Sequence, residues 1–426
     1  MKVLIKGGRV INPANDFDGI IDILFEKDKI LNISKNIDET EAQKVIDATN
    51  LIVSPGFVDL HANFMDPGLV GREDLKSGCL SSAKGGYTSI VLGTENKPSP
   101  DQVNVIEYIK KYSQIMPIRI YPVGAFSEER LGEYLADLRF LYNHGAIGFS
   151  DGLRPIDDKE LLKQGLLIAK KLQVPVAIYL EDLDKVKVRG INEGKVSEKL
   201  KVGATNSIAE DLDCAKIFEL AKETNARIDI AYLSTKRSVE IINIARLMNL
   251  DIHAEVQALS LILTEKALEK KGTLAKVLPP LRTEQDRKAL IEGLQSNTIE
   301  IISSNHFPCT EEEKSLRLRE AQSGAIGLET VLGICGLKLV DPGLLSWNEV
   351  ISKISLNPAN LYSLDAGELK IGGRADITIF DPEEQWVVED KFESKSKNTP
   401  LIGTTLKGKI KYTICKGLCV YRDKTE

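Results

Sequence analysis

The chain has 426 residues, of which 42% are hydrophobic and 28% are charged, so its composition is that of a folded protein with a large apolar core. A formal net charge of −6 argues against nucleic acid as a partner, because proteins that bind nucleic acid usually present a basic face. No apolar run is long enough to cross a bilayer, and Lys2 and Lys6 interrupt the first one, so we expect neither membrane association nor a signal peptide. The cysteines are scattered without a Cys-x-x-C pair, which is typical of reduced thiols and predicts a cytoplasmic location.

Short β-rich segments, 3–11 and 20–25, begin the chain, and the turn-forming sequence Asn12-Pro-Ala-Asn15 separates them. From about residue 55 the pattern changes to strands that alternate with amphipathic helices. The predicted strands are 88–92, 119–123, 147–149, 174–180, 227–233, 251–256 and 299–303, and the predicted helices are 128–142, 158–172, 208–224, 237–248 and 284–294. This repeated alternation favours a closed (β/α)8 barrel over an open sheet.

Beyond residue 360 the chain returns to short β-rich segments, 376–380 and 411–415, and a hairpin-like Lys416-Gly417 follows the second one. We therefore predict an α/β fold with two domains. Residues 55–359 form a TIM-type (β/α)8 barrel, and residues 1–54 and 360–426 together form a small β-sandwich beside it.

The most informative segment is Ser54-Pro-Gly-Phe-Val-Asp-Leu-His61-Ala-Asn63-Phe-Met65-Asp-Pro-Gly68, where an apolar strand runs into a polar, turn-forming stretch. Barrel enzymes place catalytic residues at such strand ends. Further motifs follow in order: Lys84-Gly-Gly-Tyr-Thr88, Gly145-Ala-Ile-Gly-Phe-Ser-Asp151, Pro279-Pro-Leu-Arg282, Gly327-Leu-Glu329, Asn357-Pro-Ala359, Gly373-Arg-Ala-Asp376 and Asn398-Thr-Pro400. With these motifs, nearly the whole chain resembles the dihydroorotase branch of the cyclic-amide hydrolases, in the amidohydrolase superfamily.

The resemblance implies a zinc centre whose bound hydroxide attacks a ring amide, and an aspartate that carries a proton to the leaving nitrogen. In this branch the ligands are a His-x-His pair, a bridging aspartate, two later histidines and a final catalytic aspartate. His61 and Asp151 match the first histidine and the bridging aspartate. The four other positions are substituted, by Asn63, Tyr179, Tyr232 and, at the catalytic aspartate, Asn305.

These substitutions disfavour zinc. A tyrosine phenol has a pKa of about 10, so it stays protonated near neutral pH unless a metal drives its ionisation. The amides of Asn63 and Asn305 offer neutral carbonyl oxygens, and Asn305 cannot accept and return a proton. Catalytic zinc normally has three protein ligands, and His61 and Asp151 supply only two. We therefore expect no metal cofactor, with zinc present only if the chain is an active enzyme.

The positions that the resemblance assigns to substrate binding are also substituted. Met65 replaces the arginine that binds the substrate's carboxylate, Glu95 replaces a nearby asparagine, and Leu278 replaces a third contact. Cys309 stands where a histidine belongs, and no histidine is placed by sequence to activate it as a nucleophile. Glu95 would repel an anionic substrate unless a cation such as Arg72 pairs with it. This change predicts a negative pocket.

The retained and substituted residues also have structural interpretations, which we favour. His61 would be a hydrogen-bonded barrel histidine, and Asp151 a cap of the loop that follows it rather than part of a cation site. Tyr179 and Tyr232 would fill the volume left by the metals, with hydrogen bonds to each other or to Asp151. His306 would be a satisfied polar residue rather than a residual base.

The resemblance to the family, together with the substituted ligand and substrate-binding positions, predicts a non-catalytic dihydroorotase-like protein of pyrimidine biosynthesis. Some relatives of this kind serve as structural partners of aspartate transcarbamoylase, and barrels of the family are commonly homo-oligomers. Two alternatives stay open. The chain could be an active dihydroorotase, or another cyclic-amide hydrolase, with an altered metal site. It could also be a regulator that binds a small molecule in the altered pocket.

Overall fold

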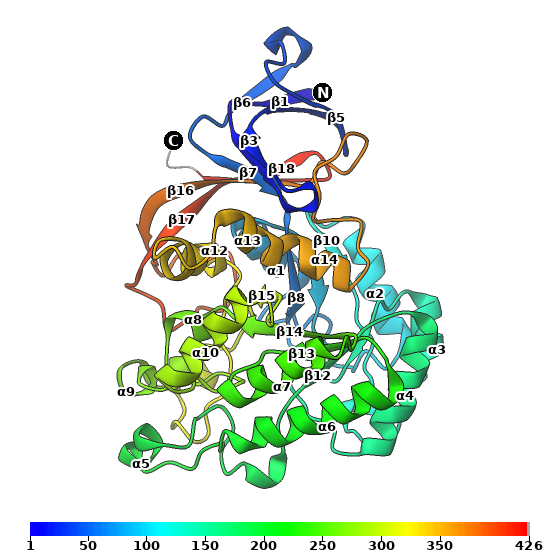
Figure 1. Ribbon diagram of the computed structural model, residues 1–426, viewed down its shortest axis with the longest axis vertical. Helices are drawn as coiled ribbons and strands as arrows, with labels where there is room; N and C mark the ends of the chain where they lie inside the picture. Colours follow the sequence, from blue (N-terminus) through cyan, green and yellow to red (C-terminus); the bar gives the residue numbers. More distant parts are fainter. Residues whose placement is uncertain (424–426) are drawn as a thin grey trace.

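Residues 1–423, which the computed structural model describes, form a barrel of parallel strands surrounded by helices, with a β-sandwich at one end of it (Figure 1). The barrel strands are β8 (Phe57–Ala62), β9 (Tyr87–Leu92), β10 (Arg119–Tyr121), β11 (Phe149–Ser150), β12 (Val176–Tyr179), β13 (Ile228–Ala231), β14 (Ile252–Gln257) and β15 (Ile301–Ser303). Neighbouring strands pair in chain order, and a bridge between Gly124 and Phe149 joins β10 to β11. The amide of Asn63 donates to the carbonyl of His306 at 2.9 Å beyond the ends of β8 and β15, which closes the barrel. The predicted fold class is confirmed.

Helices cover the outside of the barrel (Figure 1). The longer ones are α1 (Leu75–Lys84), α2 (Val103–Ser113), α3 (Leu138–His144), α4 (Lys159–Leu172), α6 (Ile208–Thr224), α7 (Lys236–Leu247) and α10 (Glu284–Gln295). Shorter helices are α5 (Lys195–Leu200), α8 (Leu259–Ile262), α9 (Ala267–Lys271), α11 (Glu311–Ser315), α12 (Val331–Cys335), α13 (Trp347–Ile351) and α14 (Asn357–Leu361). None of the described helices is long and apolar enough to span a membrane.

The predicted helix over 128–142 is wrong. Glu129 and Arg130 have φ values of 50° and 57°, in the left-handed region that a continuing α-helix excludes. The helix begins only at Leu138, where the carboxylate of Asp137 accepts a hydrogen bond from the amide of Phe140 and caps it. The apolar spacing of the segment was correct for α3 alone.

The sandwich combines both ends of the chain in two sheets. One contains β5 (Lys29–Ser34), β4 (Asp22–Glu26), β1 (Lys2–Lys6) and β6 (Lys44–Asp47), in that order. The other contains β18 (Leu418–Arg422), β17 (Thr405–Cys415), β16 (Ile377–Val387), β7 (Ile52–Pro55), β2 (Arg9–Asn12) and β3 (Phe17–Ile20). One apolar core includes Ile5 and Phe25 from the first sheet and Val53, Ile379 and Ile414 from the second. The predicted limits at residues 54 and 360 stay predictions.

Arg119 connects the barrel to the sandwich. It lies on β10, and its guanidinium contacts Asp376 and Asp28 of the sandwich domain, each at 2.7 Å. The Asp376 side chain is only 6% exposed, so its charge depends on this cation.

We expect Arg119→Met to lower the free energy of unfolding by about 3 kcal/mol, because the substitution leaves the Asp376 carboxylate buried without its partner. The matched control is Arg237→Met on α7, since the ion pair of Arg237 with Glu240 is solvent-exposed and should contribute less than about 1 kcal/mol. Urea unfolding of the three proteins measures both effects. Equal losses would show that the contact between barrel and sandwich does not depend on this ion pair.

Candidate functional site

The residues that the resemblance singled out gather where the barrel strands end. His61 is the second-last residue of β8, and Tyr179 is the last residue of β12. Tyr232 follows β13 and Asn305 follows β15. Three of these, His61, Tyr232 and Asn305, together with Met65, have φ values between 46° and 69°. Left-handed backbone is unfavourable for side chains of this size, and such residues concentrate at functional sites. The strand ends at this mouth therefore have the strained backbone that is common at functional sites.

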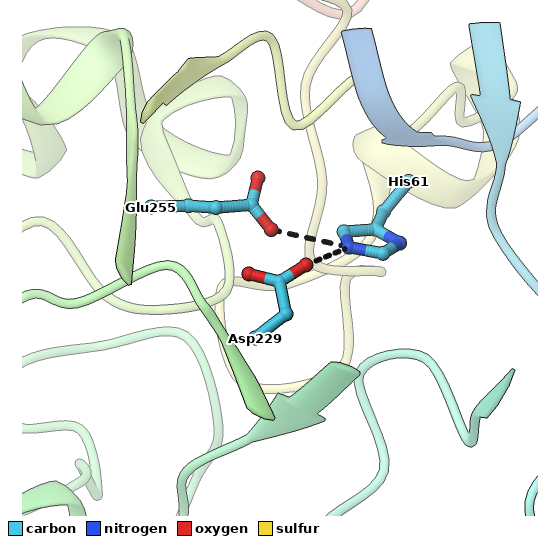
Figure 2. A group of neighbouring side chains, drawn as sticks. All are labelled: His61, Asp229 and Glu255. Carbon is cyan, nitrogen blue, oxygen red and sulfur yellow. Dashed lines mark hydrogen bonds and ion pairs between the residues drawn. The ribbon is translucent and has the colours of Figure 1, made fainter. Parts of the chain in front are cut away.

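His61 points toward two carboxylates inside the barrel (Figure 2). Its Nε2 lies 3.0 Å from Oδ2 of Asp229 and 3.1 Å from Oε1 of Glu255. Tyr362 adds a hydroxyl that donates to Asp229 at 3.3 Å. Sequence reasoning missed both carboxylates, although each is the one acidic residue of a buried barrel strand, β13 or β14, where buried charge is rare.

This group is buried, and its charges depend on one another. Burial by itself lowers the pKa of His61, but Glu255 and Asp229 outweigh that effect and raise the pKa to about 10. Burial, together with the charge of Asp229, raises the pKa of Glu255. At neutral pH His61 is therefore an imidazolium that lies between Asp229 and Glu255, below the barrel mouth.

Asp151 is engaged elsewhere. Its Oδ1 accepts hydrogen bonds from the amides of Phe126 and Ser127 at 2.9 and 3.0 Å, and its Oδ2 accepts one from the Ser127 hydroxyl. It therefore caps the loop after β10, not the loop that follows it as predicted. Among the described residues, the one group of three metal-ligating side chains is His61, Asp229 and Glu255, and Asp151 does not belong to it.

The two asparagines act as hydrogen-bond donors. Nδ2 of Asn63 donates to the carbonyl of His61 at 3.1 Å. Nδ2 of Asn305 donates to Oε1 of Gln257 at 2.8 Å and to the carbonyl of Leu278 at 2.6 Å. An aspartate at position 305 could make neither bond while ionised, so Asn305 stabilises the loop after β15 in a way that the family's aspartate cannot.

An apolar cluster fills the mouth above His61. It consists of the buried side chains of Met65, Leu153, Tyr179, Tyr232, Leu278, Phe307 and Cys309, with Ala231. Burial raises the pKa of both phenols well above its usual value, which keeps them protonated. The structure supports the packing role of the tyrosines, but the predicted hydrogen bonds to Asp151 are wrong. The Tyr232 hydroxyl has no partner among the described residues, and the Tyr179 ring packs against the Arg189 guanidinium.

The remaining candidates have structural surroundings. Burial raises the pKa of the Cys309 thiol to about 11, and its sulfur contacts only carbonyl oxygens, so it is not an activated nucleophile. His306 is fully buried, with Nε2 3.4 Å from Glu73 and Nδ1 accepting from the amide of Gly327.

The predicted negative pocket is wrong. Glu95 forms an ion pair with Arg130 at 2.6 Å, whereas the proposed partner, Arg72, pairs with Glu313. Arg130 comes from the left-handed turn after β10, which the predicted continuous helix would have directed elsewhere. Glu95 is therefore neutralised by a residue that the sequence did not indicate.

Because Asn305 is a donor, Asn305→Asp should destabilise the fold rather than restore chemistry. Gln257 cannot turn its amide to compensate, since its Nε2 already donates to Ser260 and to the carbonyl of Pro279. We expect the free energy of unfolding to fall by about 2 kcal/mol at neutral pH, measured in urea. The matched control is Asn249→Asp, an exposed asparagine that is also left-handed, with a φ of 56°. An unchanged Asn305→Asp protein would contradict the donor role.

Known proteins share both the sequence and the fold. The sequence model of the Amidohydrolase family matches residues 52–420. The chain is 41% identical to a dihydroorotase of Clostridium acetobutylicum over 423 residues, which cover 99% of this chain and 100% of that protein. It is 39% identical to a dihydroorotase of Aquifex aeolicus, with the same coverage.

Solved structures that share the fold include the L-hydantoinase of Arthrobacter aurescens, with a TM-score of 0.88 at 24% identity over 99% of this chain and 96% of that one. The dihydropyrimidinase of Brevibacillus agri has a TM-score of 0.86 at 22% identity, covering 100% of this chain and 96% of its own. The terminal β-sandwich beside a barrel is part of this shared fold. The chain belongs to the amidohydrolase family and is similar to dihydroorotases along its whole length.

Proposed function

We propose that the chain serves pyrimidine biosynthesis as a dihydroorotase-like protein without the family's zinc chemistry, and that it stabilises aspartate transcarbamoylase as a structural partner. One observation carries the first part. The two family ligands that the chain retains, His61 and Asp151, are each engaged by other protein groups, and within residues 1–423 they share no group of metal-ligating side chains.

The other ligand positions fit zinc no better. Both tyrosines are protonated and lie within the apolar cluster, so they offer no phenolate oxygen. Both asparagines direct their N–H groups at protein carbonyl or amide oxygens. A non-catalytic role needs only the intact surface of the barrel and sandwich, which is why we assign the chain an assembly function.

A second candidate function is dihydroorotase activity, and the comparisons support it better than the first, because relatives 37–41% identical over the whole chain are named dihydroorotase. They also do not support the expectation that no metal binds. His61, Asp229 and Glu255 could hold one ion: the distances of 3.0 and 3.1 Å from Nε2 approach the spacing of about 3.0–3.4 Å between neighbouring ligands of zinc. An ion held there would lower the pKa of a bound water.

An activity assay separates the two functions. We expect no ring opening of dihydroorotate above background, with or without added zinc, cobalt or manganese, because four of the six ligand positions of the family are substituted. Elemental analysis should find well under one zinc per chain. Turnover that Asp229→Asn and Glu255→Gln abolish, and that the partly exposed control Asp251→Asn leaves intact, would establish the second function instead.

Partnership is tested directly by mixing. The chain and the aspartate transcarbamoylase of the same organism should co-elute as a hetero-oligomer when purified separately and combined, and light scattering gives its mass. The same measurement on the chain alone tests the expected homo-oligomer. We expect the transcarbamoylase to be more active or more heat-stable in the complex. Separate elution at micromolar concentrations, with unchanged transcarbamoylase activity, would refute the proposed partnership.

A further inference from the structure

The segment 316–324, which follows α11, borders the barrel mouth, where Gln322 and Phe307 line the same cavity. Four of its first five residues are exposed to solvent. Leu318 packs against the core from a partly buried position, and Ala321 is buried but small. Because apolar packing holds so little of this segment, its position depends mainly on polar contacts.

Two lysine side chains supply those contacts. Lys276 donates from Nζ to the carbonyl oxygens of Arg319 and Ala321, at 3.1 and 2.7 Å. Lys314 of α11 donates to the carbonyl of Gln322 at 2.9 Å, to that of Lys276 at 3.3 Å and to one further carbonyl at 3.0 Å. Both side chains are buried, with exposed fractions of 3% and 6%. The two amines therefore attach the segment to the barrel through backbone carbonyls.

No negative charge neutralises these amines. Within residues 1–423 neither lysine forms an ion pair with a carboxylate. Glu313 acts on Lys314 from the same helix, but it pairs with Arg72. Cys309 also lies near Lys314, and it stays a neutral thiol because burial raises its pKa to about 11. A buried ammonium without a counter-ion is unfavourable, since carbonyl oxygens replace only part of the water that it loses.

The surroundings of Lys276 are mainly cationic. It lines an open cavity with three other cations and one carboxylate, which are Lys187, Arg189, Arg319 and Glu320. Burial lowers the pKa of Lys276 to about 8. Burial, together with the charge of Lys276, lowers the pKa of Lys314 to about 8 as well. Both amines therefore lose their protons more readily than a lysine in water.

We propose that Lys276 and Lys314 form a pH-sensitive switch, which lets the segment 316–324 separate from the barrel mouth while both amines are protonated and holds it there when they are neutral. Separation returns each ammonium charge to water, which favours the open form of the protonated protein. A neutral amine has no charge to hydrate, and its two N–H groups still suffice for both carbonyl contacts of Lys276. The switch thus regulates access to the cavity that Gln322 lines, and it does not depend on the proposed partnership.

The response to pH has a defined direction. In the closed form each lysine has a pKa of about 8, and in the open form its pKa returns toward the ordinary value of 10.5. Between these values the open form binds more protons than the closed form, so a rise in pH favours closure. We expect opening to become about tenfold less frequent for each lysine between pH 7 and pH 9.

Hydrogen exchange of the full-length chain, followed by mass spectrometry at pH 7 and pH 9, measures this opening. The amide of Gln322 bonds to the carbonyl of Glu313, and the amide of Gly324 bonds to that of Lys276, so separation of the segment exposes both amides. Their protection factors, which divide out the intrinsic effect of pH on exchange, should rise with pH. Protection factors that stay equal at the two pH values would overturn the proposal.

Variants assign the response to these two amines. Lys276→Met and Lys314→Met should each reduce the rise in protection about tenfold, and the double variant should abolish it. If the methionine variants do not fold, Lys276→Gln and Lys314→Gln keep N–H donors without a titrating proton and should show the same loss of pH dependence. A rise that persists in a folded double variant would overturn the proposal.

Lys353→Met is the matched control. Lys353 is also 3% exposed, and burial also lowers its pKa to about 8. It donates to the carbonyl of Ile299, before the start of β15 and therefore at the end of the barrel away from the mouth. The rise in protection of Gln322 and Gly324 should be unchanged in this variant. An equal loss in Lys353→Met would show that the response is a property of the whole fold and would overturn the assignment to Lys276 and Lys314.

Discussion

Three carboxylates without access to solvent, those of Asp59, Asp229 and Glu255, impose the main constraint on the interior of this barrel. A buried charge is tolerated only when nearby groups replace the water that it has lost. Ser304 donates its amide and hydroxyl to Asp59, at 2.7 and 2.5 Å, while His61 lies between the other two. A histidine that pairs with two acidic side chains in this way is held with its Nε2 toward the interior. His61 therefore takes part in the charge balance of the barrel interior.

The packing above His61 follows from that arrangement. The volume at the strand ends is filled by thioether, phenol and aliphatic groups, which favour one another over water. The left-handed residues His61, Met65, Tyr232 and Asn305 keep the strand ends in place, and the new side chains bond to that backbone as Asn63 and Asn305 do. These side chains thus extend the apolar core to the strand ends.

Charged side chains lie at the rim of the same mouth, outside the apolar cluster. Arg189 packs on the Tyr179 ring and pairs with Glu181, and Arg130 pairs with Glu95, so cations lie directly above the apolar layer. The apolar cluster beneath these cations has a low dielectric constant, which strengthens their electric field. The exposed charge of the mouth therefore lies at its rim and not in the apolar cluster.

The sequence by itself determined the fold and the family. The spacing of apolar residues, the turn sequences and the order of motifs from Ser54 to Asn398 are local properties, and each predicts its element without knowledge of the rest. They also identified the substituted positions, because Asn63, Tyr179, Tyr232 and Asn305 occur inside recognisable motifs. The hairpin that the sequence predicts at Lys416-Gly417 is also confirmed, because both residues have the positive φ that a two-residue turn requires.

Only the tertiary structure decided which side chains meet. His61 is separated from Asp229 by 168 residues, and closure of the barrel brings them together. Asp151 bonds to the loop after β10, and Glu95 pairs with Arg130, because a left-handed turn interrupts what apolar spacing predicts to be one helix. Periodicity describes which face of an element is apolar, but side-chain partners depend on backbone direction and on strands distant in the chain. The charge of the mouth, which comes from those partners, could not be predicted from the sequence.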